Sequence, residues 1–294
     1  MNLRQLKAFV AVCRVGGISR AAEILHVSQP ALSRQIQDLE EEFGARFFYR
    51  EHRRIELTPS GHLMLLRAEE MIELAERTKQ DILIDQSELS GMIRIGCVET
   101  NASQLLADLI SSFIDEFPKV GFDLYSADGD DLRRQLDENR IDYAVVLEPV
   151  EIAKYESQKF PCTERWGVVV RRDDWPEDRH VFSAEDMQSY SVILPRRTIV
   201  RSDLAEWFQI PEASIRSRIS HNLSGNAMAL VKAGLGGLVT AEGAYSMHSS
   251  ESCRFLPFSP EKNIPHMLVR KKNHPLTKAA EFFWKRLSES SSSK

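Results

Sequence analysis

The feature that most constrains this chain is a long segment after Gly61, up to about Gln86, that contains neither glycine nor proline. Apolar residues such as Leu63 and Leu66 recur along it at helical spacing. At a rise of 1.5 Å per residue, a helix of roughly 27 residues would be about 40 Å long. So long a helix rarely buries its apolar stripe within one small domain. We therefore predict that residues 59–88 form a linker and dimerisation helix between an N-terminal and a C-terminal domain.

Three shorter helices are predicted ahead of this segment. Apolar residues at helical spacing predict the first over residues 3–15, ended by a pair of glycines. Ser19 is the predicted N-cap of the second helix, and Ser28 that of the third, with Pro30 in its first turn. The apolar residues of the third helix predict its buried stripe: Leu32, Ile36, Leu39 and Phe43.

A basic hairpin, or wing, is predicted after Gly44. The apolar runs 47–49 and 55–57 flank a tip, residues 50–54, that contains three arginines. The whole chain has a net charge of −5, yet residues 1–60 hold nine Lys and Arg against seven Asp and Glu. This segregation is typical of a module with one face toward phosphate.

From Met92 onward, strand and helix patterns alternate, which predicts mostly parallel sheets covered by helices. The early strands are predicted over 93–98, 122–127 and 143–147, and the later ones over 166–172, 191–195, 214–220, 236–242 and 265–272. The length suits an α/β domain over residues 92–288 with two lobes and a cleft between them. The predicted bounds are 92–162 plus 267–288 for lobe I and 163–266 for lobe II.

With these elements placed, the N-terminal sixty residues resemble the LysR-type transcriptional regulators. The matching residues occur in one order: Phe9, Ser19, Arg20, Ala21, Ala22, Leu25, Ser28, Gln29, Pro30, Ala31, Leu32, Ser33, Ile36, Leu39, Glu40, Phe43, Gly44, Phe47, Arg50 and Leu57 to Gly61. The C-terminal 200 residues resemble that family's effector-binding domain in element order and in two shorter signatures, Ile141-Asp142 and LVKAGLGGLV at 230–239.

The resemblance implies a winged helix-turn-helix domain over residues 1–58, with the helix-turn-helix at 18–37 and the helix that begins at Ser28 in the major groove. Gln29 suits adenine and Arg34 suits guanine. The predicted DNA contacts of this helix are Ser28, Gln29, Pro30, Ser33, Arg34 and Gln37. The wing contributes Arg50, Arg53 and Arg54, along the backbone or in the minor groove.

The resemblance also implies a periplasmic-binding-protein-like effector domain with a small ligand between its lobes. The predicted effector contacts are Thr100, Asn101, Ser103, Gly129, Arg197, Thr198 and Asn222. Hydroxyl groups, helix N-termini and a basic loop suit a small organic anion such as a carboxylate. The acidic residues nearby leave a cationic or amino-bearing ligand open: Glu99, Asp128, Asp130 and Glu148.

Other classes of function find less support. No Ser/His/Asp set, metal-ligand spacing or phosphate loop stands out, so we expect no enzyme activity, no metal and no cofactor. The alternative is a regulator of the same family that senses redox state through Cys162 and Cys253. We find no signal peptide and no apolar run of about 18 residues, and we expect a cytoplasmic protein without membrane contact.

The resemblance finally implies partners and a mode of action. We expect a homodimer or homotetramer on double-stranded DNA with an inverted-repeat site, and an activator that also regulates its own gene. A ligand that binds open and closed lobes differently would then change DNA binding or bending.

Overall fold

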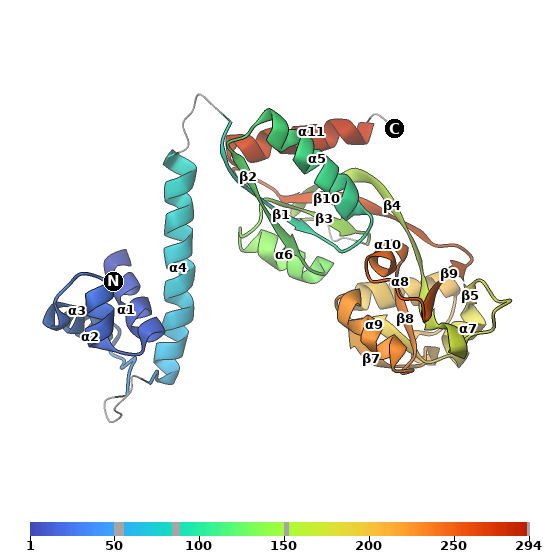
Figure 1. Ribbon diagram of the computed structural model, residues 1–294, viewed down its shortest axis with the longest axis horizontal. Coiled ribbons are helices and arrows are strands. Elements are labelled where there is room, and N and C mark those ends of the chain that lie inside the picture. The colour runs from blue at the N-terminus through green and yellow to red at the C-terminus, as the bar shows by residue number, and fades with distance from the viewer. Residues whose placement is uncertain (50–55, 84–88, 150–152, 293–294) are drawn as a thin grey trace. The chain divides into compact units, whose positions relative to one another are not determined.

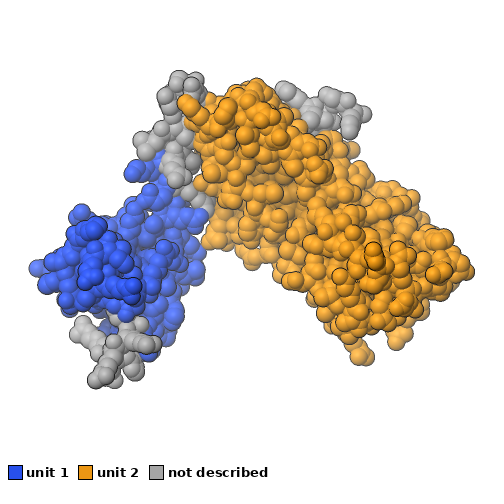
Figure 2. Space-filling model, in the orientation of Figure 1, with its two compact units in different colours: residues 1–84 blue, residues 85–294 orange. Residues whose placement is uncertain are grey.

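The protein is described by a computed structural model that covers residues 1–49, 56–83, 89–149 and 153–292. The chain forms two compact units, residues 1–84 and 85–294, each shown in its own colour in Figure 2. No helix among the described residues is long and apolar enough to cross a bilayer.

The N-terminal unit is all-helical apart from the base of a hairpin. Its helices are α1 (Leu3–Val15), α2 (Ile18–Ile24), α3 (Gln29–Phe43) and α4 (Pro59–Leu83). The predicted start of the second helix was wrong. Because Gly16 ends α1 in the left-handed conformation and the chain resumes helical geometry at Ile18, the N-cap is Gly17, and Ser19 lies inside α2.

The core of this unit includes the start of the long helix. Leu32, Ile36 and Leu39 are buried as predicted, but Phe43 is 48 % exposed. Phe43 is the last residue of α3, so its ring lies at the edge of the core, with its centroid 6.1 Å from that of Phe47. The core also contains these residues of α1, the hairpin and α4: Leu6, Phe9, Val12, Phe47, Phe48, Met64 and Ala68. The first turns of α4 thus belong to the N-terminal core.

The predicted hairpin is confirmed at its base. Phe48 and Leu57 form an antiparallel bridge, and the N–H of Tyr49 donates to the carbonyl of Glu56 at 3.0 Å. The carboxylate of Glu40 accepts the N–H groups of Phe47 and Phe48 at 2.7 and 3.3 Å. The tip, residues 50–55, lies outside the described residues.

The C-terminal unit begins with a lobe whose sheet is covered on both faces (Figure 1). Its strands are β1 (Gly91–Cys97), β2 (Val120–Ser126), β3 (Tyr143–Leu147), β10 (Asn263–Lys271) and the first part of β4 (Tyr155–Arg171). Helices α5 (Ala102–Glu116) and α11 (Lys278–Ser292) pack on one face, and α6 (Gly129–Asp137) on the other.

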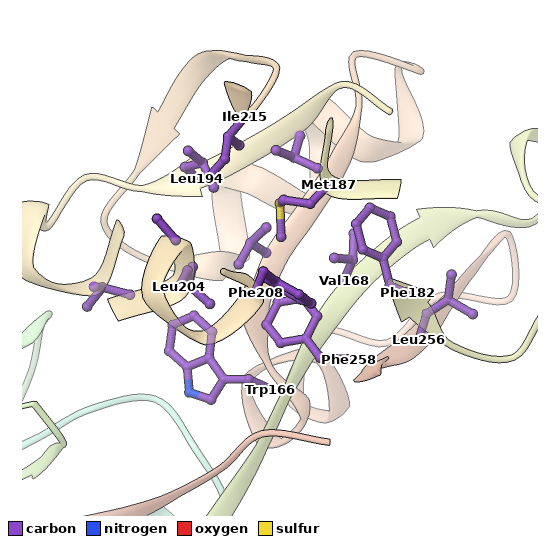
Figure 3. Packing of buried hydrophobic residues seen from close by; sticks show 14 of the residues in the cluster. Trp166, Val168, Phe182, Met187, Leu194, Leu204, Phe208, Ile215, Leu256 and Phe258 are labelled. Carbon is purple, nitrogen blue, oxygen red and sulfur yellow. The ribbon is translucent and has the colours of Figure 1, made fainter. Parts of the chain in front are cut away.

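The second lobe has the same layered build. Its strands are the rest of β4, β5 (Phe182–Ser183), β6 (Val192–Pro195), β7 (Ser217–His221), β8 (Gly237–Ala241) and β9 (Cys253–Ser259). Its helices are η1 (Arg172–Asp174), α7 (Ala184–Ser189), α8 (Thr198–Phe208), η2 (Glu212–Ser214), α9 (Ser224–Lys232) and α10 (Glu242–Met247). Side chains alternate along β4: Val168 joins the core under α7 and α8 (Figure 3), and Val169 joins the core under α9.

The two lobes are joined by β4 and β10, which pair with each other. The strand order is β2-β1-β3-β10-β4-β8-β6-β7, and β4 pairs with β10 in one lobe and with β8 and β9 in the other. The sheet is mixed: β1 pairs in parallel with β2 and β3, and β6 with β7 and β8, as expected, but the crossing strand β10 runs antiparallel to both β3 and β4. A chain that crosses between the lobes and returns must run in opposite directions.

We predict that Gly61→Ala destabilises the N-terminal unit, although alanine is the better helix former by about 1 kcal/mol. A Cβ at Gly61 would lie 2.1 Å from the carbonyl oxygen of Phe47, so α4 or the hairpin must move, at a cost of about 1–3 kcal/mol. Circular dichroism during thermal unfolding measures this. The exposed neighbour Ser60→Ala is the control, and an unchanged or raised midpoint for Gly61→Ala would contradict the packing argument.

Candidate DNA interface and effector site

The first turn of α3 presents polar atoms at a capped helix N-terminus. The hydroxyl of Ser28 accepts the N–H of Ala31 at 3.4 Å, and Pro30 occupies the first turn, where its missing N–H costs no intrahelical bond. The other amides of that turn and the helix dipole favour a phosphate. This end of α3 is therefore suited to an anionic backbone.

The exposed face of α3 carries the predicted base-reading side chains. Gln29, Arg34 and Gln37 are exposed, and Ser33 is half-buried. The spacing from Gln29 to Gln37 is about 12 Å along the helix. Arg34 makes no ion pair with any residue that the structure describes, so its five donors are available to base edges or phosphates. The predicted wing contacts Arg50, Arg53 and Arg54 lie outside the described residues.

A cavity lies between the two lobes of the C-terminal unit, at the carboxyl ends of strands from both. The first lobe contributes residues after β1, β2 and β3, and the second contributes residues after β6 and β7 and from β8. Ligands bind at this position in open α/β sheets, next to helix N-termini. Its volume is about 100 Å³. For comparison, a cavity of roughly 150 Å³ holds a benzene.

Polar groups that lack a partner lie among the apolar lining. Within the described part of the chain, the indole N–H of Trp166 and Nδ1 of His221 have no hydrogen-bond partner. His221 Nε2 lies 3.1 Å from the carbonyl oxygen of Val239, which can only accept, so Nε2 carries the proton. Burial lowers the pKa of His221, which favours the neutral ring. The hydroxyls of Ser224 and Thr240, 2.7 Å apart, add further polar atoms.

An ionic network joins the two lobes beside this cavity. Arg197 Nε lies 2.9 Å from Asp130 Oδ1, and the Arg197 side chain is only 10 % exposed. Arg196 Nη2 lies 2.7 Å from an oxygen of Asp128 and 2.8 Å from one of Asp131. The acids belong to the first turn of α6 in one lobe and the arginines precede α8 in the other. The network therefore fastens one lobe to the other.

Glycine at position 129 allows this contact. A Cβ there would lie 2.8 Å from Arg197 Nη1, so a side chain would push the guanidinium away from α6. Burial tends to raise the pKa of Asp130, but the charges and hydrogen bonds of Arg197 and Arg133 outweigh it and hold that pKa below its usual value. Asp130 thus stays ionised and keeps Arg197 paired.

A buried carboxylate lies at the hinge beside the cavity. Glu164, fully buried on β4, accepts the N–H of Asn101 at 2.7 Å and the N–H of Gly243 at 2.9 Å. These amides belong to the starts of α5 in the first lobe and α10 in the second. Burial raises the pKa of Glu164, against the effect of the two amides. One side chain thus ties both lobes to the crossing strand.

The structure brings together part of the predicted effector set. Thr100, Gly129, Arg197 and Asn222 line the cavity. The other three predicted residues are not among the lining residues. The N–H of Asn101 is taken by Glu164, the hydroxyl of Ser103 donates to the carbonyl of Thr100 at 2.9 Å, and Thr198 lies exposed on α8.

The sequence did not single out Trp166, His221 and Thr240 as cavity residues. Each lies on a predicted strand or directly after one. Only His221 could have been located from the sequence, because it lies at the end of β7, next to the predicted effector contact Asn222. The inward direction of Trp166 and Thr240 depends on pairing between β4 and β8, which the sequence does not display.

The cysteines are free thiols among the described residues. Burial raises the pKa of Cys13 and of Cys97 to about 12, and raises that of Cys162. Cys162 and Cys253, the pair considered for redox sensing, do not lie close together in this structure. Cys253 pairs across from Arg171, nine residues beyond Cys162 on β4, which places the two cysteines roughly 30 Å apart along the strand. A disulfide needs Cα atoms within about 7 Å.

Comparison with known families assigns both units. The model described as "LysR substrate binding domain" matches residues 86–292, and "Bacterial regulatory helix-turn-helix protein, lysR family" matches residues 3–62. The chain belongs to the LysR family of transcriptional regulators. It is therefore a DNA-binding transcriptional regulator with an effector-binding domain, and the predicted family is confirmed.

Full-length relatives of this LysR-type regulator are themselves described as regulators. It is 25 % identical over 288 residues to the "Uncharacterized HTH-type transcriptional regulator YfeR" of Shigella flexneri, covering 96 % of this chain and 92 % of that one. It is 26 % identical over 293 residues to the "HTH-type transcriptional regulator CzcR" of Bacillus cereus, covering 98 % of each.

A solved LysR structure shares the fold. The chain aligns with full-length CbnR, crystallised in complex with its target DNA, with a TM-score of 0.75 at 22 % identity, over 99 % of this chain and 100 % of that one. The predicted fold class, a helix-turn-helix domain before an α/β domain, is confirmed.

We predict that Glu164→Gln loosens the C-terminal unit by about 1–3 kcal/mol, because an amide offers one acceptor oxygen to two buried N–H groups. The raised pKa of Glu164 adds a pH dependence. The stability that Glu164 contributes is fully present below its pKa in the unfolded chain and is lost as the pH rises through its pKa in the folded protein. The stability difference between wild type and Glu164→Gln should therefore shrink with rising pH.

All four tryptophans lie in this unit, so their fluorescence during urea unfolding at a series of pH values reports on it. The exposed Glu185→Gln is the control and should change stability by less than about 0.5 kcal/mol. A constant deficit at every pH would contradict the assigned pKa shift.

Proposed function

We propose that this LysR-family member is a DNA-binding activator, which also regulates its own gene, and that a small organic anion bound between its lobes controls it. Residues 1–58 form the DNA-binding domain and 59–88 the linker and dimerisation helix. Residues 92–288 form the effector domain, with lobes 92–162 plus 267–288 and 163–266. The observation that carries the anion is Arg197, a nearly buried guanidinium at the cavity whose partner is a carboxylate of the opposite lobe.

DNA reading by α3 is supported by the capped N-terminus and by Arg34, which forms no ion pair with any described residue. Gln29 and Arg34 carry the two side-chain types that bind adenine and guanine with paired hydrogen bonds. Ser28 and Ser33 are proposed to contact phosphate, directly or through water. The arginines of the wing add an attraction that falls with salt.

Pairing of two chains through α4 is supported by its exposed apolar side chains. Leu63, Leu66 and Leu74 are 52–62 % exposed, whereas Met64 and Ala68 on the same helix are buried in the N-terminal core. Solvent-exposed leucines along one helix are typical of a helix–helix interface. Two DNA-binding domains would then meet an inverted repeat, as homodimer or homotetramer.

Control by a carboxylate is supported by competition for Arg197. Asp130 already offers Arg197 a carboxylate, and it is 40 % exposed, so a ligand carboxylate replaces one anion by another at little cost in desolvation. The ligand also gains the donors left unpaired in the cavity, such as the Trp166 indole N–H. Release of Asp130 leaves Arg196, paired with Asp128 and Asp131, to hold the start of α6 to the second lobe, and this weaker link allows the lobe angle to change.

We predict that Arg34→Ala relaxes base preference, because a bidentate arginine–guanine pair is worth about 1–3 kcal/mol of discrimination. Affinities for the operator and for scrambled DNA, measured by fluorescence anisotropy at fixed salt, give the ratio. Arg218→Ala removes the same charge from an exposed site on the other unit and is the control. Equal losses on both DNAs for Arg34→Ala would contradict base reading.

We predict opposite effects for the two partners at the cavity. Thermal unfolding with a panel of small carboxylates, amines and phosphates first finds a ligand, since 100 times its dissociation constant stabilises by about 2.7 kcal/mol. Asp130→Asn removes the competing anion and should tighten carboxylate binding, whereas Arg197→Ala should abolish it. The exposed Asp123→Asn is the charge-matched control. If an amine binds wild type and Asp130→Asn abolishes that binding, the effector is a cation and the proposed anion is wrong.

A further inference from the structure

Three side chains of metal-ligating type converge at the hinge, away from the cavity lining. Ligand atoms of Cys162, Glu164 and His266 all lie within 4.8 Å of one another. Cys162 and Glu164 belong to β4 and His266 to β10, the two strands that cross between the lobes. Glu164 and His266 are fully buried and Cys162 is half-buried.

An irregularity in the pairing of the two strands creates this cluster. Pro265 pairs with Thr163, but the next residue, His266, pairs with Phe160, so Cys162 belongs to an unpaired step of β4. A bulge of this kind turns side chains away from the regular alternation and recurs next to functional sites. Cys162 and Glu164, two residues apart on β4, share one side of the strand by ordinary alternation, and the shifted register places His266 beside them.

His266 is held in the form that binds metal. Its Nδ1 lies 3.0 Å from the carbonyl oxygen of Cys162, which can only accept, so Nδ1 carries the proton and Nε2 carries the lone pair. Nε2 lies 2.7 Å from the hydroxyl of Thr100, which donates to it. A metal-bound histidine has the same arrangement, with its second nitrogen fixed on a backbone carbonyl. Burial also lowers the pKa of His266, so the ring is neutral.

Once ionised, Glu164 carries a negative charge that no cationic side chain of the described residues neutralises. It accepts two backbone N–H groups, and no lysine or arginine among residues 1–49, 56–83, 89–149 and 153–292 forms an ion pair with it. Buried charges in proteins are paired or coordinate metal ions. Each carboxylate oxygen keeps a second lone pair beyond its amide bond.

We propose that Cys162, Glu164 and His266 bind a divalent transition-metal ion such as Zn²⁺ or Co²⁺, which makes the hinge of the effector domain a metal site. One thiolate, one imidazole and one carboxylate favour these borderline ions over Mg²⁺ or Ca²⁺. Metal–ligand bonds of about 2.0–2.3 Å place tetrahedral ligand atoms roughly 3.5 Å apart, a spacing compatible with ligand atoms that all lie within 4.8 Å of one another. The thiol proton of Cys162 passes to solvent as the sulfur–metal bond forms, with no change of oxidation state.

The ion would alter the hinge and the cavity together. It takes the lone pair of His266 Nε2 and frees the hydroxyl of Thr100, which lines the cavity. It also holds β4 and β10 together across the bulge. The fourth position falls to water.

Cobalt titration of full-length protein, stripped of metal by dialysis against a chelator, tests the site. We expect one Co²⁺ per chain, a thiolate-to-cobalt charge-transfer band in the near ultraviolet, and loss of that band when Zn²⁺ is added. Cys162→Ser should abolish the band and weaken binding by more than the 10–100-fold that loss of a supporting partner costs. Cys13→Ser removes another half-buried thiol, in the N-terminal unit, and should bind like wild type.

A second variant separates loss of the ligand from loss of the fold. Zn²⁺ should raise the midpoint of tryptophan-detected unfolding less for His266→Gln than for wild type. Without metal, the variant should still unfold cooperatively. The absence of a charge-transfer band in wild-type protein, or the same band in Cys162→Ser, would overturn the proposal. Neither result bears on carboxylate binding, which is measured separately.

Discussion

Glu164 links the two lobes of the effector domain. Its carboxylate is buried on β4, the strand that both lobes share, and accepts a hydrogen bond from one backbone N–H of each lobe. Moving one lobe without the other leaves a buried carboxylate oxygen or a buried N–H unpaired, at about 1–3 kcal/mol each. These two bonds, together with the contacts of Arg196 and Arg197 to α6, hold the starts of α5 and α10 and the cavity walls in their relative positions.

The parts of the fold that local signals define could be predicted from the sequence. The helices of the N-terminal unit follow from apolar spacing and caps, and the lobes from alternating strands and helices. The first half of β4 was missed, because residues 155–165 are largely polar and contain a proline; their strand form depends on pairing with β10. The exposure of Phe43 could not be predicted either, since the spacing of a stripe does not say where the core ends.

The candidate site was predictable in position but not in its bonding. Strand ends and helix starts located Thr100, Arg197 and Asn222 at the cavity. The sequence does not show that Arg197 already has a partner, because Asp130 lies 67 residues away and in the other lobe. Glu164 was missed for a similar reason: it resembles a surface residue of a polar strand until both lobes are folded around it.

The connection between the lobes consists of two hydrogen-bonded strands rather than loose loops. A two-stranded ribbon twists readily about its length but resists shearing and stretching, which would break its ladder. Rotation of one lobe against the other is therefore elastic torsion of β4 and β10, and its restoring force grows with angle. Such a coupling favours graded displacements, in which ligands of different size set different angles, over a switch between two fixed positions.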